Sequence, residues 1–283
     1  MSLIKLSSGA TIPSIGLGCY DIPNSQTSNI VYQACLAGYR HFDTAVLYGN
    51  EEKVAQGMLK YLKENPQVNR TQLFYTTKLW NSQLGYNATK RAIGELVAKV
   101  GGLEYIDLLL IHSPLPGKTK RLESYAAMQE AVDSGVVKNI GVSNYGQHHI
   151  EELLNWEGLK YPPVVNQIEI SPWVMRSELA NWCSEQGIQV EAYAPLTHGY
   201  KLVETDPTSG LAKICQKYAK SPAQVLIKWS LTKGYIPLPK TKTKERLREN
   251  LNVEDFELTK EEVAEIDQPG AYEPTDWECT DAP

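Results

Sequence analysis

The sequence predicts an α/β protein that folds as a (β/α)8 barrel, with one domain spanning residues 1–283. Two observations lead to this prediction. Short β-rich runs recur about 25 to 46 residues apart, and segments with helical periodicity separate them. Parallel strands joined by crossover helices give that alternation, and eight such units in roughly 250 residues close into a barrel. A doubly wound open sheet is the alternative, because it has the same alternation.

The predicted order of elements begins with a β-hairpin formed by residues 4–6 and 11–13, in which Gly9 supplies the turn. We expect this hairpin to cover the bottom of the barrel. The first barrel strand follows at residues 15–17, and the other seven begin at His41, Leu73, Ile106, Asn139, Val164, Gln189 and Tyr235. The predicted helices between them span residues 28–37, 51–62, 88–100, 124–132, 148–154 and 177–185.

Local signals mark the ends of several helices. Gly38 is a typical residue to end the first one, and Ser124 and Ser177 are predicted N-caps of the helices that they begin. Two segments lie outside the repeat. They are a polar loop at residues 198–210 and a C-terminal tail at residues 268–283, which we expect near the active-site face of the barrel.

The composition excludes several classes of protein. The chain is 42% hydrophobic and 22% charged with a net charge of −5, which argues against a general nucleic-acid or membrane binder. No run approaches the ~18 apolar residues of a membrane span. The five cysteines are widely spaced and form no C-x-x-C pair, so neither a zinc site nor a disulfide framework is predicted. The N-terminus has no signal-peptide pattern, and a cytoplasmic location is expected.

Polar side chains at the carboxyl ends of the strands form the active sites of TIM barrels. Asp43 ends the second strand and Tyr48 follows it closely, while Lys78 ends the third strand and His112 ends the fourth. We therefore expect these four side chains to emerge from adjacent strands onto one face. They are the candidate catalytic residues, and no metal-ligand spacing accompanies them.

A phenol beside an ammonium group suits proton transfer. A tyrosine normally ionises near pH ~10, and the Lys78 cation is expected to lower the pKa of Tyr48 while Asp43 keeps the lysine charged. The imidazole of His112 can orient and polarise a carbonyl oxygen. The set therefore favours protonation of a carbonyl oxygen while another group delivers a hydride.

No G-x-G-x-x-G motif is present, because Asp21 stands where the third glycine would be, so a Rossmann-type cofactor site is not predicted. Residues 240–250 instead carry five basic side chains against two acidic ones. Lys240 and Arg246 are positioned to pair with a phosphate group, since a guanidinium binds phosphate through two hydrogen bonds. A solvated helix face is the alternative interpretation.

Several segments resemble the signatures of the aldo-keto reductase family, and the similarity spans residues 3–250. The matching segments are GYRHFDTA at 38–45, YGNE at 48–51, residues 107–112, GVSN at 141–144, NQIE at 166–169 and residues 239–250. In the last of these, Thr241 stands where serine is commoner. The segment around Tyr20 and the tail resemble those of small yeast-type members.

The resemblance implies NADPH-dependent reduction of aldehydes and ketones, with α-keto esters and aldoses among the candidate substrates and NADH as the weaker cofactor. It makes Tyr48 the general acid, Lys78 and Asp43 its partners, and His112 the residue that orients the substrate. The implied cofactor-binding residues are Ser143, Asn144, Gln167, Tyr193, Ala194, Leu196, Lys240, Thr241, Arg246, Glu249 and Asn250. The implied substrate-binding residues are Tyr20, Trp80, Asn81, His112 and Trp277.

Two other functions are compatible with parts of this pattern. One is a metal-dependent barrel hydrolase that uses His41, Asp43 and His112. The other is a binding module that senses a cofactor without catalysis, although all four catalytic residue types are present. The expected partner is a small carbonyl compound, the expected state is a monomer or weak homodimer, and Cys279 is expected to be a spectator thiol.

Overall fold

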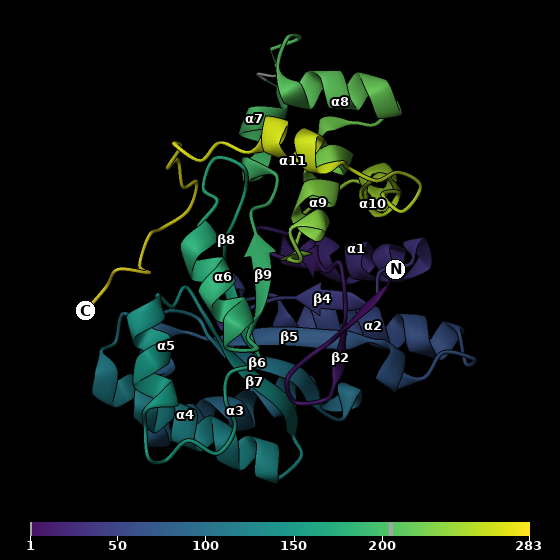
Figure 1. Ribbon diagram of the computed structural model, residues 1–283. Coiled ribbons are helices and arrows are strands. Elements are labelled where there is room, and N and C mark those ends of the chain that lie inside the picture. Colours follow the sequence, from purple (N-terminus) through teal and green to yellow (C-terminus); the bar gives the residue numbers. More distant parts are fainter. Residues whose placement is uncertain (1, 204–205) are drawn as a thin grey trace.

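The computed structural model describes residues 2–203 and 206–283, which form a (β/α)8 barrel (Figure 1). Its parallel strands follow one another around the sheet in chain order. They are β3 (Leu17–Gly18), β4 (His41–Asp43), β5 (Phe74–Leu79), β6 (Ile106–Ile111), β7 (Val137–Ser143), β8 (Val165–Glu169), β9 (Gln189–Tyr193) and β10 (Ile236–Pro237). The backbone N–H groups of Gly16 and Gly18 donate to the carbonyl oxygens of Pro237 and Pro239, both at 3.1 Å. These bonds close the sheet on itself, which excludes the doubly wound alternative.

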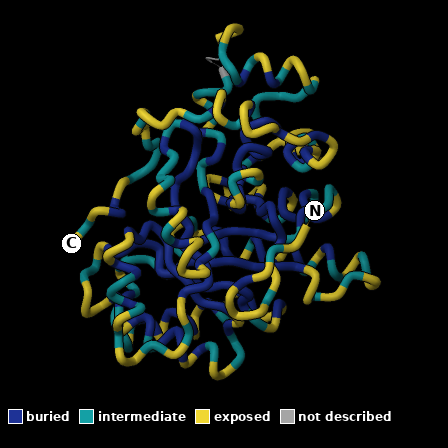
Figure 2. The backbone as a smooth tube through the Cα atoms, viewed as in Figure 1, coloured by how far each residue is buried: buried dark blue, intermediate teal, exposed yellow. Residues whose placement is uncertain are grey.

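Helices surround the sheet, and their outer faces are exposed while the strands are buried (Figure 2). They are α1 (Asn24–Ala37), α2 (Glu51–Glu64), α3 (Tyr86–Lys99), α4 (Lys118–Asp133), α5 (Gln147–Leu154), α6 (Ser177–Glu185), α7 (Tyr200–Val203), α8 (Gly210–Tyr218), α9 (Pro222–Thr232), α10 (Lys244–Leu251) and α11 (Lys260–Ile266). The predicted loop at residues 198–210 contains α7, and residues 204–205 of it lie outside the described residues. None of the described helices is long and apolar enough to cross a bilayer.

The predicted N-terminal hairpin is confirmed. Strand β1 (Leu3–Lys5) pairs antiparallel with β2 (Thr11–Pro13), and the turn between them includes Gly9 at a φ of 88°. Leu6 and Ile12 are buried in one cluster with residues from inside the barrel, such as Leu108 and Ile236. The hairpin therefore fills one end of the barrel with apolar side chains.

Strand β6 shows how the barrel aims side chains at its open end. All six of its residues are buried, because helices cover the outside and side chains fill the inside. Leu108 and Leu110 pack in the inner cluster, whereas Leu109 and Ile111 pack against the helices. Since successive strand residues point to opposite faces, His112 continues the inward set.

The two predicted serine caps are wrong. Helix α4 begins at Lys118, so Ser124 lies inside it, where its hydroxyl donates to the backbone oxygen of Lys120 at 2.6 Å. Ser177 is the first residue of α6, and the preceding Arg176 is the cap at a φ of 45°. A serine inside a helix can satisfy its hydroxyl with a carbonyl one turn back, so its presence does not mark a helix start.

The tail passes from α11 toward α5 and crosses the carboxyl ends of the strands on its way (Figure 1). Glu169, at the end of β8, accepts hydrogen bonds from the backbone N–H groups of Thr275 and Asp276 at 2.6 and 3.1 Å. The hydroxyl of Thr275 donates to the same carboxylate. The expectation that the tail lies at the active-site face is confirmed.

Gly141 of β7 offers a test of interior packing. A Cβ atom there would lie 2.6 Å from the Val165 backbone oxygen and 2.9 Å from Leu110 Cδ2. We expect Gly141→Ala to lower the free energy of unfolding by roughly 1–3 kcal/mol, measured by urea titration. Gly94→Ala in α3 is the control, because nothing lies within 4 Å of its added Cβ, and alanine there should stabilise the helix by about 0.5–1 kcal/mol. Equal effects of the two substitutions would contradict the packing argument.

Candidate active site

A buried lysine is the centre of a polar cluster at the carboxyl ends of β4 and β5. Lys78 Nζ donates to Asp43 Oδ1 at 2.7 Å and to the backbone oxygen of Thr44 at 2.9 Å. It also donates to the hydroxyl oxygen of Tyr48 at 3.3 Å. An ammonium group has three donors and no acceptor, so these oxygens use all of its hydrogens. Because the Tyr48 oxygen accepts from Lys78, the hydrogen of the phenol is left for another acceptor.

The turn after β4 brings Tyr48 to this cluster. A 3-10 helix at Val46–Tyr48 ends at Gly49, whose φ of 65° is readily adopted by glycine. The next residue, Asn50, accepts a hydrogen bond from the Thr44 hydroxyl at 2.6 Å. The turn is thus held at both ends, and the four predicted catalytic side chains lie at adjacent strand ends, as the sequence predicted.

Burial controls the protonation of two of these residues. It raises the pKa of Tyr48 well above its ordinary value, and the negative charge of Asp43 adds to the effect. The net pKa of Tyr48 therefore lies above its ordinary value, where the sequence led us to expect a lowered one. Burial also lowers the pKa of His112 well below its ordinary value, with a further contribution from the charge of Lys78. At neutral pH the phenol keeps its proton and the imidazole is uncharged.

Aromatic rings enclose the space in front of Tyr48 and His112. The ring centroids of Tyr48 and His112 are 5.7 Å apart, nearly edge to face. Trp80 and Trp277 lie 5.2 and 6.0 Å from the His112 ring and 5.5 Å from each other. On the other side, the Tyr20 ring lies 5.0 Å from that of Tyr48. A molecule that reaches the phenol would therefore contact mostly aromatic surface.

Amide and hydroxyl groups occupy the next strand ends. The Ser143 hydroxyl donates to the Gln167 backbone oxygen at 2.9 Å. Asn144 has a φ of 61°, and its amide nitrogen donates to the backbone oxygen of His112 at 3.0 Å. The Tyr193 hydroxyl donates to Asn144 Oδ1 at 2.9 Å. A non-glycine residue in this backbone region is uncommon and is often found at functional sites.

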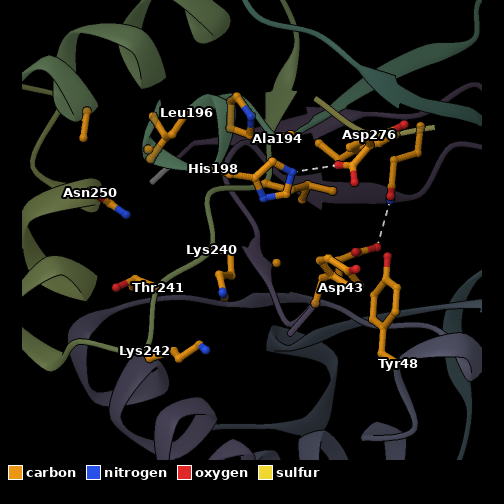
Figure 3. A pocket seen from close by; sticks show the side chains of 18 of the residues that line it. Asp43, Tyr48, Ala194, Leu196, His198, Lys240, Thr241, Lys242, Asn250 and Asp276 are labelled. Carbon is orange, nitrogen blue, oxygen red and sulfur yellow. Dashed lines mark hydrogen bonds and ion pairs between the residues drawn. The ribbon is translucent and has the colours of Figure 1, made fainter. Parts of the chain in front are cut away.

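One cavity of about 730 Å³ joins these groups to the basic segment near the C-terminus (Figure 3). Its lining includes the predicted residues Tyr20, Asp43, Tyr48, Trp80, His112, Ser143, Asn144, Gln167, Tyr193, Ala194, Leu196, Lys240, Thr241, Arg246, Glu249, Asn250 and Trp277. Asn81 does not line it, and instead accepts a hydrogen bond from the Ser113 hydroxyl at 2.7 Å. Lys78 lies behind the cavity wall with no exposed surface.

Asp21, which was not among the predicted site residues, pairs with the lysines at the basic end of the cavity. Lys240 and Lys242 lie 3.0 and 3.2 Å from Asp21 Oδ2. These lysines lower the pKa of the Asp21 carboxyl, mainly through the hydrogen bond from Lys240. Asp21 comes from the loop after β3, so this contact joins two sides of the cavity entrance. Sequence spacing gave no signal for it, because the partners are more than 200 positions apart.

The loop after β9 and the tail also meet over the cavity. His198 Nε2 and Asp276 Oδ2 lie 2.9 Å apart, as the dashed line in Figure 3 shows. This hydrogen bond raises the pKa of His198 above its ordinary value. Both residues line the cavity, and neither was among the predicted site residues. Their meeting depends on the contacts of Glu169 with the tail, which no local motif reveals.

The groups required by the hydrolase alternative do not converge. The two carboxylate oxygens of Asp43 bind Lys78 and Gln167, and His41 Nε2 lies 3.0 Å from the Thr76 hydroxyl. Across residues 2–203 and 206–283, no three His, Cys, Asp or Glu side chains are grouped so as to hold a metal ion. Cys279 is buried, which raises the pKa of its thiol to about 12, so it remains a thiol at neutral pH.

A second buried carboxyl group lies deeper in the barrel. Glu191 of β9 has no exposed surface, and its Oε2 accepts a hydrogen bond from Gln167 Nε2 at 2.8 Å. Its Oε1 lies 3.6 Å from His41 Nε2. Burial, followed by the charge of Asp43, raises the pKa of Glu191 to about 8. Glu191 was not predicted, although it lies two residues before Tyr193 in the same strand and so shares its face of the barrel.

Comparison with known proteins gives consistent matches. The model of the Aldo/keto reductase family matches residues 14–270. An uncharacterized oxidoreductase of Saccharomyces cerevisiae, YJR096W, is 61% identical over 99% of this chain and 98% of its own length. Methylglyoxal reductase DkgA of Escherichia coli O157:H7 is 38% identical over 94% of this chain and 92% of its own. The crystal structure of a Bombyx mori aldo-keto reductase in complex with NADP has a TM-score of 0.85 at 36% identity, covering 94% and 91% of the two chains.

The raised pKa of Glu191 predicts a pH-dependent stability. An ordinary glutamic acid ionises near 4.5, whereas folded Glu191 keeps its proton up to about pH 8. Between these values the folded state binds more protons than the unfolded state, so the free energy of unfolding should fall as the pH rises. Glu191→Gln cannot ionise and should lack this contribution. Urea titrations at pH 5.5 and 8.5 should show the variant gaining stability relative to the wild type at the higher pH, and parallel pH profiles would contradict the assignment.

Proposed function

Because this chain belongs to the aldo/keto reductase family, we propose that it is an NADPH-dependent reductase of small aldehydes and ketones. The observation that supports this function best is the hydrogen bonding of Tyr48. Its oxygen accepts from Lys78, so its own proton is available to a substrate beside His112. The proposed catalytic unit is the whole chain, residues 1–283, acting as a monomer or weak homodimer.

Both ends of the cavity carry groups that suit nicotinamide adenine dinucleotide phosphate. At the inner end, Ser143, Asn144 and Gln167 offer hydroxyl and amide groups for a carboxamide, and Tyr193 offers a ring face. The hydroxyl and amide contacts of these residues with one another fix their orientation. Ala194 and Leu196, which follow β9, line the wall between the two ends.

The outer end of the cavity is basic. Lys240 and Arg246 would pair with a 2′-phosphate, which NADPH has and NADH lacks, and Thr241 would add a hydroxyl. Glu249 and Asn250, farther along α10, complete this end as adenosine contacts. When bound, the reduced cofactor supplies the hydride that adds to the carbonyl carbon.

The proton for the carbonyl oxygen comes from Tyr48 in this proposal. The O–H bond of the phenol breaks as the substrate oxygen gains negative charge, and the phenolate that remains lies against the Lys78 ammonium. Asp43 keeps that ammonium charged and in position. His112 is uncharged at neutral pH, and its single N–H would orient the carbonyl oxygen without competing for the proton.

The walls of the cavity favour apolar substrates. Tyr20, Trp80 and Trp277 present ring surface close to Tyr48. Small aldehydes and ketones with aromatic or aliphatic groups, including α-keto esters, would bury that surface on binding. Aldoses would leave their hydroxyl groups against these rings and are expected to be poorer substrates.

Replacing the proposed acid should remove turnover but not cofactor binding. Tyr48→Phe keeps the ring and removes the phenolic proton, so we expect the rate of aldehyde reduction to fall by roughly 10²–10⁴. The measurement is a single-turnover reduction with NADPH already bound, which separates chemistry from binding. Tyr86→Phe, on the surface of α3, is the control. A near-normal rate for Tyr48→Phe with intact NADPH binding would make His112 the better candidate for the acid.

Replacing the proposed phosphate ligand should weaken the binding of one cofactor selectively. Arg246→Ala should raise the dissociation constant of NADPH roughly 10- to 100-fold and change that of NADH little. Arg248→Ala is a matched control, since it removes the same charge from the same helix but does not line the cavity. Intrinsic tryptophan fluorescence reports both affinities. Equal losses for NADPH and NADH would contradict the 2′-phosphate assignment.

A further inference from the structure

The barrel interior holds a polar layer between the apolar plug and Tyr48. His41, Thr76, Gln167 and Glu191 belong to it, and each has at most 1% of its surface exposed. A buried carboxyl group lowers stability unless it is neutral or hydrogen-bonded. The burial of Glu191 at this depth therefore suggests that the residue has a specific role. The proposed function uses Asp43 in the proton transfer and Gln167 in cofactor binding, but it gives no role to Glu191.

The amide of Gln167 is held from two sides. Its Nε2 carries two hydrogens and donates one to Asp43 Oδ2 and one to Glu191 Oε2, both at 2.8 Å. Rotating the amide by half a turn would set its oxygen against the Asp43 carboxylate, which has no hydrogen to donate, and would lose that bond. The orientation is thus fixed by the network. Among the described residues, no donor pairs with the remaining Gln167 oxygen, although Gln167 lines the cavity.

Glu191 is suited to this task in its neutral form. A protonated carboxyl group still has one carbonyl oxygen that accepts, and Oε2 serves that purpose for Gln167. The other oxygen, Oε1, has no hydrogen-bond partner among the described residues and faces His41 Nε2. The groups that face Glu191 are therefore Gln167, His41 and, more distantly, the charges of Asp43 and Lys78. Within the part of the chain that the structure describes, only Gln167 forms a hydrogen bond with it.

We propose that Glu191 is a positioning residue that fixes the Gln167 amide with its oxygen toward the cavity, so that the site selects a ring substituent bearing an N–H donor. This inference rests on the proposed function, because the carboxamide of a nicotinamide is such a substituent. Asp43 alone engages one hydrogen of the amide, whereas Glu191 supplies the second point of attachment. Without it, the amide is able to turn and present its nitrogen instead.

The test compares two ligands that differ only in that donor. NADP⁺ carries a carboxamide, and its 3-acetylpyridine analogue carries a methyl group in place of the amide nitrogen. We expect the wild type to bind NADP⁺ about tenfold more tightly, which corresponds to one net hydrogen bond. Glu191→Leu should reduce this ratio to about twofold or less. Glu191→Gln keeps an acceptor oxygen for Gln167 and should preserve the ratio.

A third ligand separates positioning from general damage. The nucleotide 2′,5′-ADP lacks the nicotinamide, and its affinity should be the same in the wild type and in both variants. Tryptophan fluorescence titration measures all of these affinities, and thermal unfolding reports folding. Should Glu191→Leu fail to fold, Glu191→Met, an unbranched side chain of similar length, is expected to give the same loss of discrimination.

The outcomes distinguish the inference from the function on which it rests. An unchanged ratio in a folded Glu191→Leu or Glu191→Met variant would overturn the positioning role while leaving the reductase proposal intact. A parallel loss of affinity for all three ligands would likewise show that Glu191 is only structural. Failure of the wild type to bind either NADP⁺ or 2′,5′-ADP would overturn the proposed function, and the role of Glu191 with it.

Discussion

The cost of burying the Lys78 ammonium shapes the whole open end of the barrel. An unpaired charge in the protein interior is strongly unfavourable, and Lys78 has no exposed surface. It is stable there because Asp43, the Thr44 carbonyl and the Tyr48 hydroxyl accept its three hydrogens. Each of these oxygens comes from β4 or the turn that follows it, so the geometry of that turn and the charge of the lysine depend on each other.

Asp43 also connects Lys78 to polar residues deeper in the barrel. Its second carboxylate oxygen accepts from Gln167, and the other hydrogen of that amide goes to Glu191. Four strands, β4, β5, β8 and β9, are thus joined by side-chain hydrogen bonds as well as by their backbones. A change in any one member of this chain alters the others, because each has donors or acceptors already committed.

The sequence pattern predicted a barrel, with a doubly wound sheet as the alternative, and placed Asp43, Lys78 and His112 at adjacent strand ends on one face. It could not predict the direction in which the pKa of Tyr48 moves, because that depends on burial beneath residues distant in sequence. Nor could it find the contact of His198 with Asp276, which requires the tail to cross the barrel. Asn81 was expected in the cavity from the family resemblance, yet the 3-10 turn that it begins directs it to Ser113.

Trp277, one of the rings proposed to face a substrate, belongs to a different part of the chain from the groups proposed to move its proton. Trp277 lies in a tail attached through Glu169, outside the strands that carry the lysine network. Substitutions in that tail that keep its bonds to the buried Glu169 would alter the shape of the entrance without changing the lysine network. Changes in this segment would therefore alter which molecules fit the cavity, while the hydrogen bonds of Lys78 and Asp43 depend on a separate set of positions.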